Sequence, residues 1–261
     1  MDAETYYLTG CVALAMDSYD EASSNFTEAY GEDATYDRAI QIYEAYLEKD
    51  MEADGTRYLE AALKTEAKNA EDYCNRGKVY YYMEDYSNAQ KELTEAVNQK
   101  STEGMLLLGM VYRAQGDTSN ARSMYQQYVS ADGSDPAKGY NGLALCDMDD
   151  GSYDSALENI SKGLEDASTE EMQDLLFNEI VVYEKKLDFA TALSKMQEYI
   201  KMFPDDENAA KELTFLQSRN GELSNDTASD TTENTDAEAA SDAGDTTDTS
   251  DGSDESGEEE Y

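Results

Sequence analysis

The residues that could do chemistry in this chain are mostly carboxylates, and the usual catalytic partner of a carboxylate is missing. The sequence has 59 Asp and Glu, three Cys and no His. Without histidine, Ser-His-Asp and Cys-His arrangements cannot form, and the commonest general base and metal ligand is absent. No G-x-G-x-x-G or G-x4-G-K-[ST] stretch occurs that would cradle a phosphate. We therefore predict that the protein is not an enzyme and uses no cofactor.

Two acidic turns come closest to a metal site, and both fail the ligand pattern. Residues 50–55 match the opening of an EF-hand loop, but Ala61 stands where a bidentate glutamate is needed. The stretch that begins at Asp147 has Glu158 in the twelfth position, but its glycine comes one residue early. The three cysteines form no C-x2-C pair, so neither a zinc site nor a disulfide framework is indicated. We predict no metal site.

The elements that carry these residues repeat along most of the chain. One series of positions, at spacings of 32 to 36 residues, holds Gly10, Tyr43, Gly77, Gly109, Ala144 and Ile180. A second series, twelve residues later in each case, holds Ala22, Gly55, Ala89, Ala121, Ala156 and Ala192. Around both series, apolar or small residues fall at i, i+4 and i+7, which places them on one face of a helix. A period of this length predicts stacked pairs of helices without a central core.

The repeated motif resembles the tetratricopeptide repeat, W/Y-x2-L-G-x2-Y followed by G-D-Y-x2-A-x3-F-x2-A and P. Repeat one carries it as Tyr6, Gly10, Tyr19, Ala22, Phe26 and Ala29. Repeat four (Leu108, Gly109, Tyr112, Gly116, Asp117, Ala121, Tyr125) and repeat six (Tyr183, Asp188, Phe189, Ala192, Met196, Tyr199, Pro204) carry it as well. Repeat two departs most, with Tyr43 at the small position and an irregular turn expected from Asp50 to Gly55. The resemblance implies an all-α fold, a right-handed α-solenoid of six antiparallel helix pairs.

The repeats and a final helix form the predicted domain, residues 1–220. The six repeats cover about 3–36, 36–69, 70–103, 102–135, 137–170 and 173–206, and a cap helix follows at 207–219. We expect Ala210, Leu213 and Gln217 of the cap to face inward, with polar residues outside. Residues 221–261 contain 15 acidic and no basic residues and only two large apolar ones. Such a segment cannot bury enough apolar surface to fold, so we predict a disordered acidic tail.

Charge excludes some classes of partner. The net charge is −40, and removing the 15 acids of the tail still leaves 44 acidic against 19 basic residues. A field of that sign repels phosphate backbones and anionic lipids, so we expect no nucleic-acid binding. The longest apolar run, 105–112, is too short for a membrane span. The first residues show neither the basic stretch nor the apolar stretch of a leader peptide. If Met1 is the native start, we expect a cytoplasmic protein. If a leader was removed, we expect an extracytoplasmic or cell-surface one.

The family resemblance also implies where a partner binds. Counting Ala3 as position 1 of a repeat, positions 2, 5, 9, 12 and 13 of each first helix face the concave side in this family. The residues carried over are Tyr7, Leu14, Ile40, Leu47, Lys78, Tyr81, Tyr82, Leu106, Met110, Arg113, Asn141, Leu145, Met148, Phe177, Val181 and Lys185. Exposed apolar and aromatic residues in a line are typical of a partner site. The alternative is that tight winding packs several of them against the next repeat.

These observations favour an adaptor or scaffold that binds a peptide or protein segment in its groove, centred on Tyr82, Met110 and Arg113. The chaperone-tail-binding subset of the family is rejected, because Cys74, Leu107 and Gly142 do not fit its basic clamp. The alternative class is an exported acidic surface protein that acts as a spacer or collects divalent cations loosely; a calcium titration of the melting temperature separates the two. Self-association through the first repeat is a further option.

Overall fold

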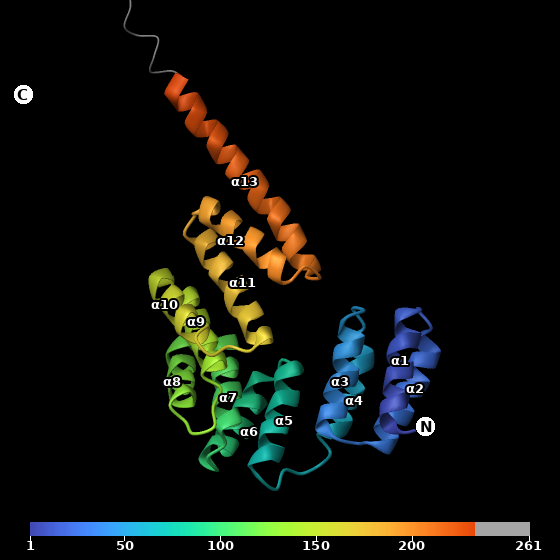
Figure 1. Cartoon of the computed structure of the whole chain (residues 1–261). Helices are drawn as coiled ribbons and strands as arrows, with labels where there is room; N and C mark the ends of the chain where they lie inside the picture. Colours follow the sequence, from blue (N-terminus) through green and yellow to red (C-terminus); the bar gives the residue numbers. More distant parts are fainter. Residues whose placement is uncertain (233–261) are drawn as a thin grey trace, which may run out of the picture.

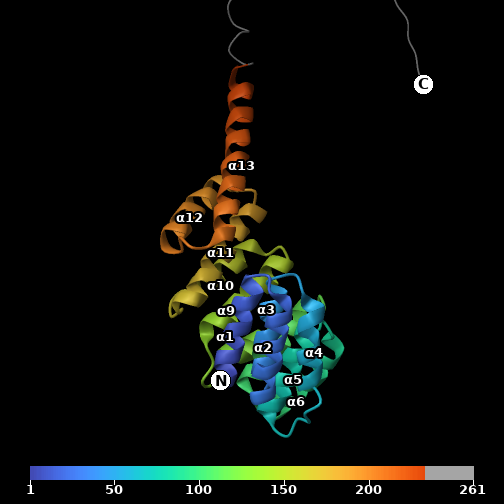
Figure 2. The same cartoon turned by 90° about the vertical axis from the view of Figure 1, so that its right-hand side faces the viewer.

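The computed structural model describes residues 1–232, and every regular element in that range is a helix. Six antiparallel pairs follow one another in a curved row, and a thirteenth helix projects beyond the last pair (Figures 1 and 2). The first three pairs are α1 (Ala3–Ala15) with α2 (Tyr19–Glu32), α3 (Tyr36–Leu47) with α4 (Glu52–Ala62), and α5 (Ala70–Tyr82) with α6 (Tyr86–Asn98). The next three are α7 (Thr102–Ala114) with α8 (Thr118–Val129), α9 (Pro136–Asp149) with α10 (Tyr153–Gly163), and α11 (Thr169–Lys185) with α12 (Phe189–Met202), followed by α13 (Glu207–Thr232). The predicted all-α array of helix pairs is confirmed.

The turn inside each pair has the same geometry in all six repeats. The residue at position 15 adopts the left-handed conformation with φ between 56° and 78°; these residues are Asp17, Asp50, Glu84, Gly116, Gly151 and Leu187. The next residue donates its backbone N–H to the carbonyl at position 11 over 2.7 to 3.0 Å, which closes the first helix with a Schellman-type bond. A leucine suits this conformation poorly, and Leu187 is also 72% exposed.

This shared turn corrects the expectation for repeat two. Its turn is as short as the others, because Asp50 takes the left-handed position and α4 begins at Glu52. The irregular turn predicted to reach Gly55 is therefore wrong. The stretch that resembled an EF-hand loop is largely helical, so its carboxylates do not encircle a common point.

Small residues let the two helices of a pair approach closely. A Cβ added to Gly10 would stand 2.6 Å from the Phe26 ring, and one added to Gly109 would stand 2.7 Å from the Tyr125 ring. Repeat two reverses the arrangement: the large residue, Tyr43, lies on the first helix, and a Cβ on Gly55 of the second helix would lie 2.9 Å from its Cα. The pair keeps its close contact because one side of the crossing stays small.

Helix α13 caps the array, with a register that differs from the expected one. Ala209 and Leu216 are fully buried against α12 and Leu213 is half-buried, whereas Ala210 and Gln217 are exposed. The N-terminal cap sets this register, because Asp206 Oδ1 accepts the backbone N–H groups of residues 208 and 209 at 3.0 and 3.1 Å. The helix also continues beyond the predicted end at 219, since a glycine at 221 weakens a helix without ending it. The rest of the predicted tail, residues 233–261, lies outside the described residues.

Part of the acidic composition serves the helix ends. Aspartates precede α6, α8 and α12 and accept the N–H three residues on, at 3.1 to 3.2 Å. The hydrogen bonds from Asn120 hold the pKa of Asp117 below its ordinary value, and those from Thr191 do the same for the pKa of Asp188. Within residues 1–232, no helix is long and apolar enough to cross a bilayer.

Candidate functional site

A pocket of about 830 Å³ opens on the first helices of pairs three to six. Its lining comes from α5, α7, α9 and α11, with Thr118 and Tyr125 added from α8 and Gly116 and Asp150 from turns. We call it the large pocket. Because consecutive first helices lie side by side in the array, residues about one period apart in sequence share its walls.

The floor of the large pocket is apolar. Tyr81, Leu106, Met110 and Leu145 line it, and each is half-buried. Beneath them lies Tyr125, which is only 2% exposed and packs against Gly109 of α7 and Gly142 of α9. A Cβ on Gly142 would stand 2.6 Å from this ring, so the glycines make the room that the ring fills. Burial raises the pKa of Tyr125, so its hydroxyl stays protonated.

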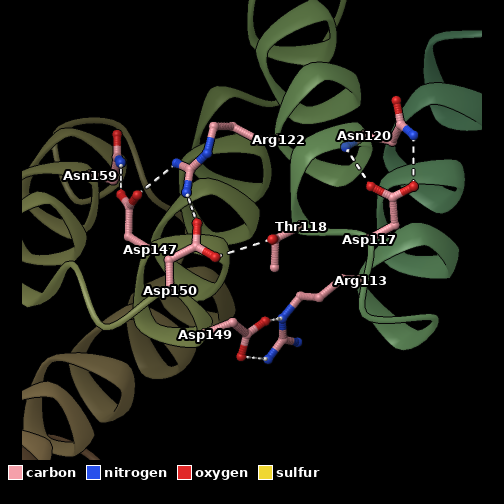
Figure 3. A network of polar contacts seen from close by, with 9 residues as sticks. All are labelled: Arg113, Asp117, Thr118, Asn120, Arg122, Asp147, Asp149, Asp150 and Asn159. Atoms are coloured by element: carbon pink, nitrogen blue, oxygen red, sulfur yellow. Dashed lines mark hydrogen bonds and ion pairs between the residues drawn. The ribbon is translucent and has the colours of Figure 1, made fainter.

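A network of arginines and aspartates at the carboxyl end of α9 borders the pocket, and Arg113, Asp149 and Asp150 of this network line it (Figure 3). Arg113 forms two bonds to the Asp149 carboxylate, at 2.6 Å from Nε and 3.3 Å from Nη2. Arg122 bridges the buried Asp147 at 2.6 Å and Asp150 at 2.8 Å. The turn that looked faintly like a calcium loop is thus neutralised by arginine.

The opposite wall carries Lys138 and Asp174. Lys138 Nζ lies 3.7 Å from Asp135 and 3.6 Å from Glu171, so its charge is already balanced. Asp174, exposed on α11, has no hydrogen bond or ion pair with any residue in the described part of the chain. Partial burial, with Glu170 and Glu171 nearby, raises the pKa of the Asp174 carboxyl.

A smaller pocket of about 400 Å³ adjoins the first and shares Asn141, Leu145 and Asp174 with it. We call it the small pocket; it extends the lining to Phe177 and Tyr199. Asn178 donates to Asn141 Oδ1 at 2.8 Å, which leaves the Asn141 amide nitrogen available as a donor where the pockets meet. Together the two pockets form a trough along pairs three to six.

The sixteen predicted groove residues do not share one surface. Six line the large pocket: Tyr81, Leu106, Met110, Arg113, Asn141 and Leu145. Phe177 lines the small one, while Lys78, Met148 and Val181 are half-buried elsewhere and Leu47 and Lys185 are exposed.

The first three repeats differ in part from the expectation. Leu14 and Ile40 are 2% and 3% exposed and belong to the core, because α1 and α3 pack closely enough to cover them. Tyr7 packs on Phe26 with ring centroids 5.9 Å apart. Tyr82, expected at the centre of the site, instead donates its hydroxyl to Glu44 and lies outside the large pocket. The packing against the next repeat that was anticipated as an alternative thus takes Leu14 and Ile40 out of the groove.

Several residues of the pocket were not among those predicted: Ala114, Lys138, Asp149 and Asp174. Each occupies position 2 or 13 of its repeat, so the spacing rule itself reaches them. The prediction took no residue from position 2 and only two from position 13, so these four were not carried over.

The remaining candidates for chemistry are possible metal ligands and the three cysteine thiols. Within residues 1–232 no three potential ligands gather where they could hold a metal ion. Cys74 and Cys146 are buried free thiols and Cys11 is half-buried. Burial raises the pKa of the Cys146 thiol to about 11, which disfavours the reactive thiolate.

A comparison with protein families finds the tetratricopeptide repeat over part of the chain. A family model described as Tetratricopeptide repeat matches residues 74–136 and again 106–167, the repeats that build most of the large pocket. No curated protein matches the sequence.

Solved structures share the fold at low identity. A tetratricopeptide repeat protein from Parabacteroides merdae is 16% identical, with a TM-score of 0.61 over 82% of this chain and 84% of that one. PilW, a type IV pilus biogenesis factor, is 14% identical, with a TM-score of 0.53 over 81% and 98%. A chain of the APC/C hetero-tetramer Cut9-Hcn1 is 16% identical, with a TM-score of 0.52 over 82% of this chain and 42% of its own length. At these identities the likeness establishes the fold alone.

Proposed function

We propose that this chain, whose residues 74–167 match the tetratricopeptide repeat, is a non-enzymatic interaction module that binds a segment of another protein in the trough formed by the large and small pockets. The observation that carries the proposal is the half-buried apolar floor of the large pocket. A stable monomer would ordinarily bury such a row of side chains or replace it with polar ones.

The shape of the trough favours an extended segment. It runs across successive first helices, so a bound chain can place one side chain over each helix. Tyr81 and Met110 are residue types enriched at protein interfaces, and the free Asn141 amide can donate to a backbone carbonyl of the guest. The floor accepts apolar side chains, and Asn141 orients the backbone.

Selection from a random displayed peptide library tests the proposal with the full chain as bait. We expect enriched peptides to contain leucine, methionine or aromatic residues, and the Met110→Ser/Leu145→Ser variant to bind them at least about ten-fold more weakly, because two contacts of the floor are lost. Fluorescence anisotropy of labelled peptides gives the dissociation constants.

The matched control is Met202→Ser, which removes a half-exposed methionine from α12 outside both pockets. It should leave affinity unchanged. Equal binding by the wild type and the Met110→Ser/Leu145→Ser variant, with helical content intact, would remove the trough as the site.

A specific observation favours self-association as a second role. Leu8 and Val12 of α1 and its C-cap residue Met16 are 54%, 59% and 72% exposed and form one stripe at i, i+4 and i+8. No charged residue occurs between Glu4 and Asp17, although 30% of the chain is charged. We propose that this stripe packs against the same stripe of a second copy, since the acidic surfaces elsewhere on two copies repel each other.

Sedimentation equilibrium tests this second proposal. The wild type should show a reversible monomer–dimer equilibrium, and Leu8→Glu/Val12→Glu should weaken it by about ten-fold or more, because two charges would be buried without partners. Met202→Glu places the same charge on another exposed apolar residue and should have no effect. A wild type that stays monomeric at high concentration would rule out the second copy.

A further inference from the structure

We propose that the segment bound in the trough carries a lysine or arginine next to an apolar residue, with the cation paired to Asp174. This inference rests on the proposed function, because it names the chemistry of the guest in the same site.

The cations of the large pocket are not available to an acidic guest. Arg113 is held by Asp149 through two bonds, and Lys138 lies between Asp135 and Glu171. An incoming carboxylate would have to displace one of these intramolecular partners. It would also approach Asp149, Asp150 and Asp174, which outnumber the two cations of the lining. An acidic or phosphorylated segment is therefore disfavoured.

Asp174 differs from the other carboxylates of the pocket walls. Asp149 and Asp150 accept from Arg113 and Arg122, whereas no cation lies within pairing distance of Asp174 among residues 1–232. Partial burial beside other carboxylates disfavours its charged form, and a cation brought by a guest would restore it. The bound pair would be shielded from water by the guest itself, which strengthens it relative to a pair on an open surface.

Position fixes what stands next to the cation. Asp174 lines both pockets, with the Leu106 and Met110 floor on one side and Phe177 on the other. A guest whose cation reaches Asp174 therefore places its neighbouring side chains over apolar surface. The expected motif is a basic residue with an apolar residue on at least one side.

The charge of the whole molecule acts in the same direction. A net charge of −40 attracts basic segments over long range and raises their association rate, an effect that salt screens. This long-range attraction alone would not depend on any single carboxylate. The contribution of Asp174 can therefore be separated from it by comparing two single substitutions of equal charge.

A positional-scanning library of labelled nonapeptides, with one fixed leucine and every other position randomised, provides the probe. We expect the wild-type full chain to enrich lysine and arginine beside the leucine and to deplete aspartate and glutamate. Asp174→Asn should weaken the binding of the selected basic peptides roughly five-fold. It should not change the affinity for the same peptides in which serine replaces the lysine. Asp132→Asn, an exposed aspartate in the turn between α8 and α9, is the matched control and should retain the basic preference.

The outcomes separate this inference from the function on which it rests. Enrichment of apolar peptides without basic residues, or a basic preference equally strong in Asp174→Asn, overturns the inference and leaves the proposed function standing. Enrichment of acidic peptides also overturns it. A chain that enriches no peptide at all overturns the proposed function and this inference together.

Discussion

Tyr125→Ala is expected to lower the free energy of unfolding by about 3–5 kcal/mol, the range for removing a buried aromatic side chain. The ring is 2% exposed and lies between Gly109 and Gly142. Neither glycine has a side chain that could relax into the space left behind, so the cavity should persist. Urea denaturation followed by circular dichroism measures the loss. Hydrogen exchange should show the loss of protection mainly in repeats four and five, because a repeat contacts only its neighbours.

The glycines give a sharper version of the same test. In the wild type, Gly142→Ala should destabilise by about 1 kcal/mol or more, because the new methyl would stand 2.6 Å from the ring. In the Tyr125→Ala background the same change should stabilise, since the methyl fills vacated space and alanine favours the helix by about 1 kcal/mol. Gly31→Ala is the control: nothing lies within 4 Å of its added Cβ, so its effect should be equal in both backgrounds. An effect of Gly142→Ala with the same sign in both would contradict this account of the crossing.

Close helix crossings explain why so much of the fold could be predicted from the sequence. The recurrence of small residues fixes the period, and position 15 fixes the turn even where aspartate, glutamate or leucine replaces glycine. Repeat two was harder because contact at a crossing requires only one small partner. In repeat two the first helix carries the large residue, Tyr43, and the second helix carries the small one, Gly55. The sequence motif therefore looks broken, although the two helices still pack closely.

The candidate site could be predicted only in part. Position within the repeat places Leu106, Met110 and Leu145 on the pocket side, because the period brings them onto neighbouring first helices. It does not say how tightly the helices wind, which is why Leu14 and Ile40 became core residues. The sequence also did not predict the register of α13, in which Ala209 rather than Ala210 is buried. The two residues are identical in type, and only the Asp206 cap distinguishes their positions.

Charge pairing lies beyond the reach of the repeat pattern. Arg122 meets Asp147 and Asp150, which are 25 and 28 residues away, and Arg113 meets Asp149 at 36. The Arg113–Asp149 separation equals about one period, whereas those of Arg122 are shorter because Arg122 lies on the second helix of its pair. An acidic chain offers several carboxylates at each such distance. The choice among them depends on side-chain geometry at the carboxyl end of α9. That Asp174 has no partner among the described residues could be recognised only once these pairs were known.

The network around Arg122 should be the largest electrostatic contributor to the stability of this region. Arg122→Ala removes the cation beside Asp147, whose side chain is only 6% exposed and, among the residues that the structure describes, keeps one further side-chain hydrogen bond, from Asn159 at 2.7 Å. Leaving a buried carboxylate without its cation costs about 3–5 kcal/mol; because the Arg122 side chain is 29% exposed, we expect about 2–3 kcal/mol in urea denaturation.

A second substitution distinguishes lost pairing from lost packing. In the Arg122→Ala background, Asp147→Asn should recover part of the stability, because a neutral amide is easier to bury than an unpaired carboxylate. Lys186→Ala is the matched control: it removes an ion pair between neighbouring repeats whose Asp154 is 93% exposed, and solvent already screens that pair, so stability should hardly change. If Arg122→Ala costs as little stability as Lys186→Ala, or if Asp147→Asn increases the loss, the network does not hold α8 to α9. Apolar packing alone must then hold these helices in place beside the large pocket.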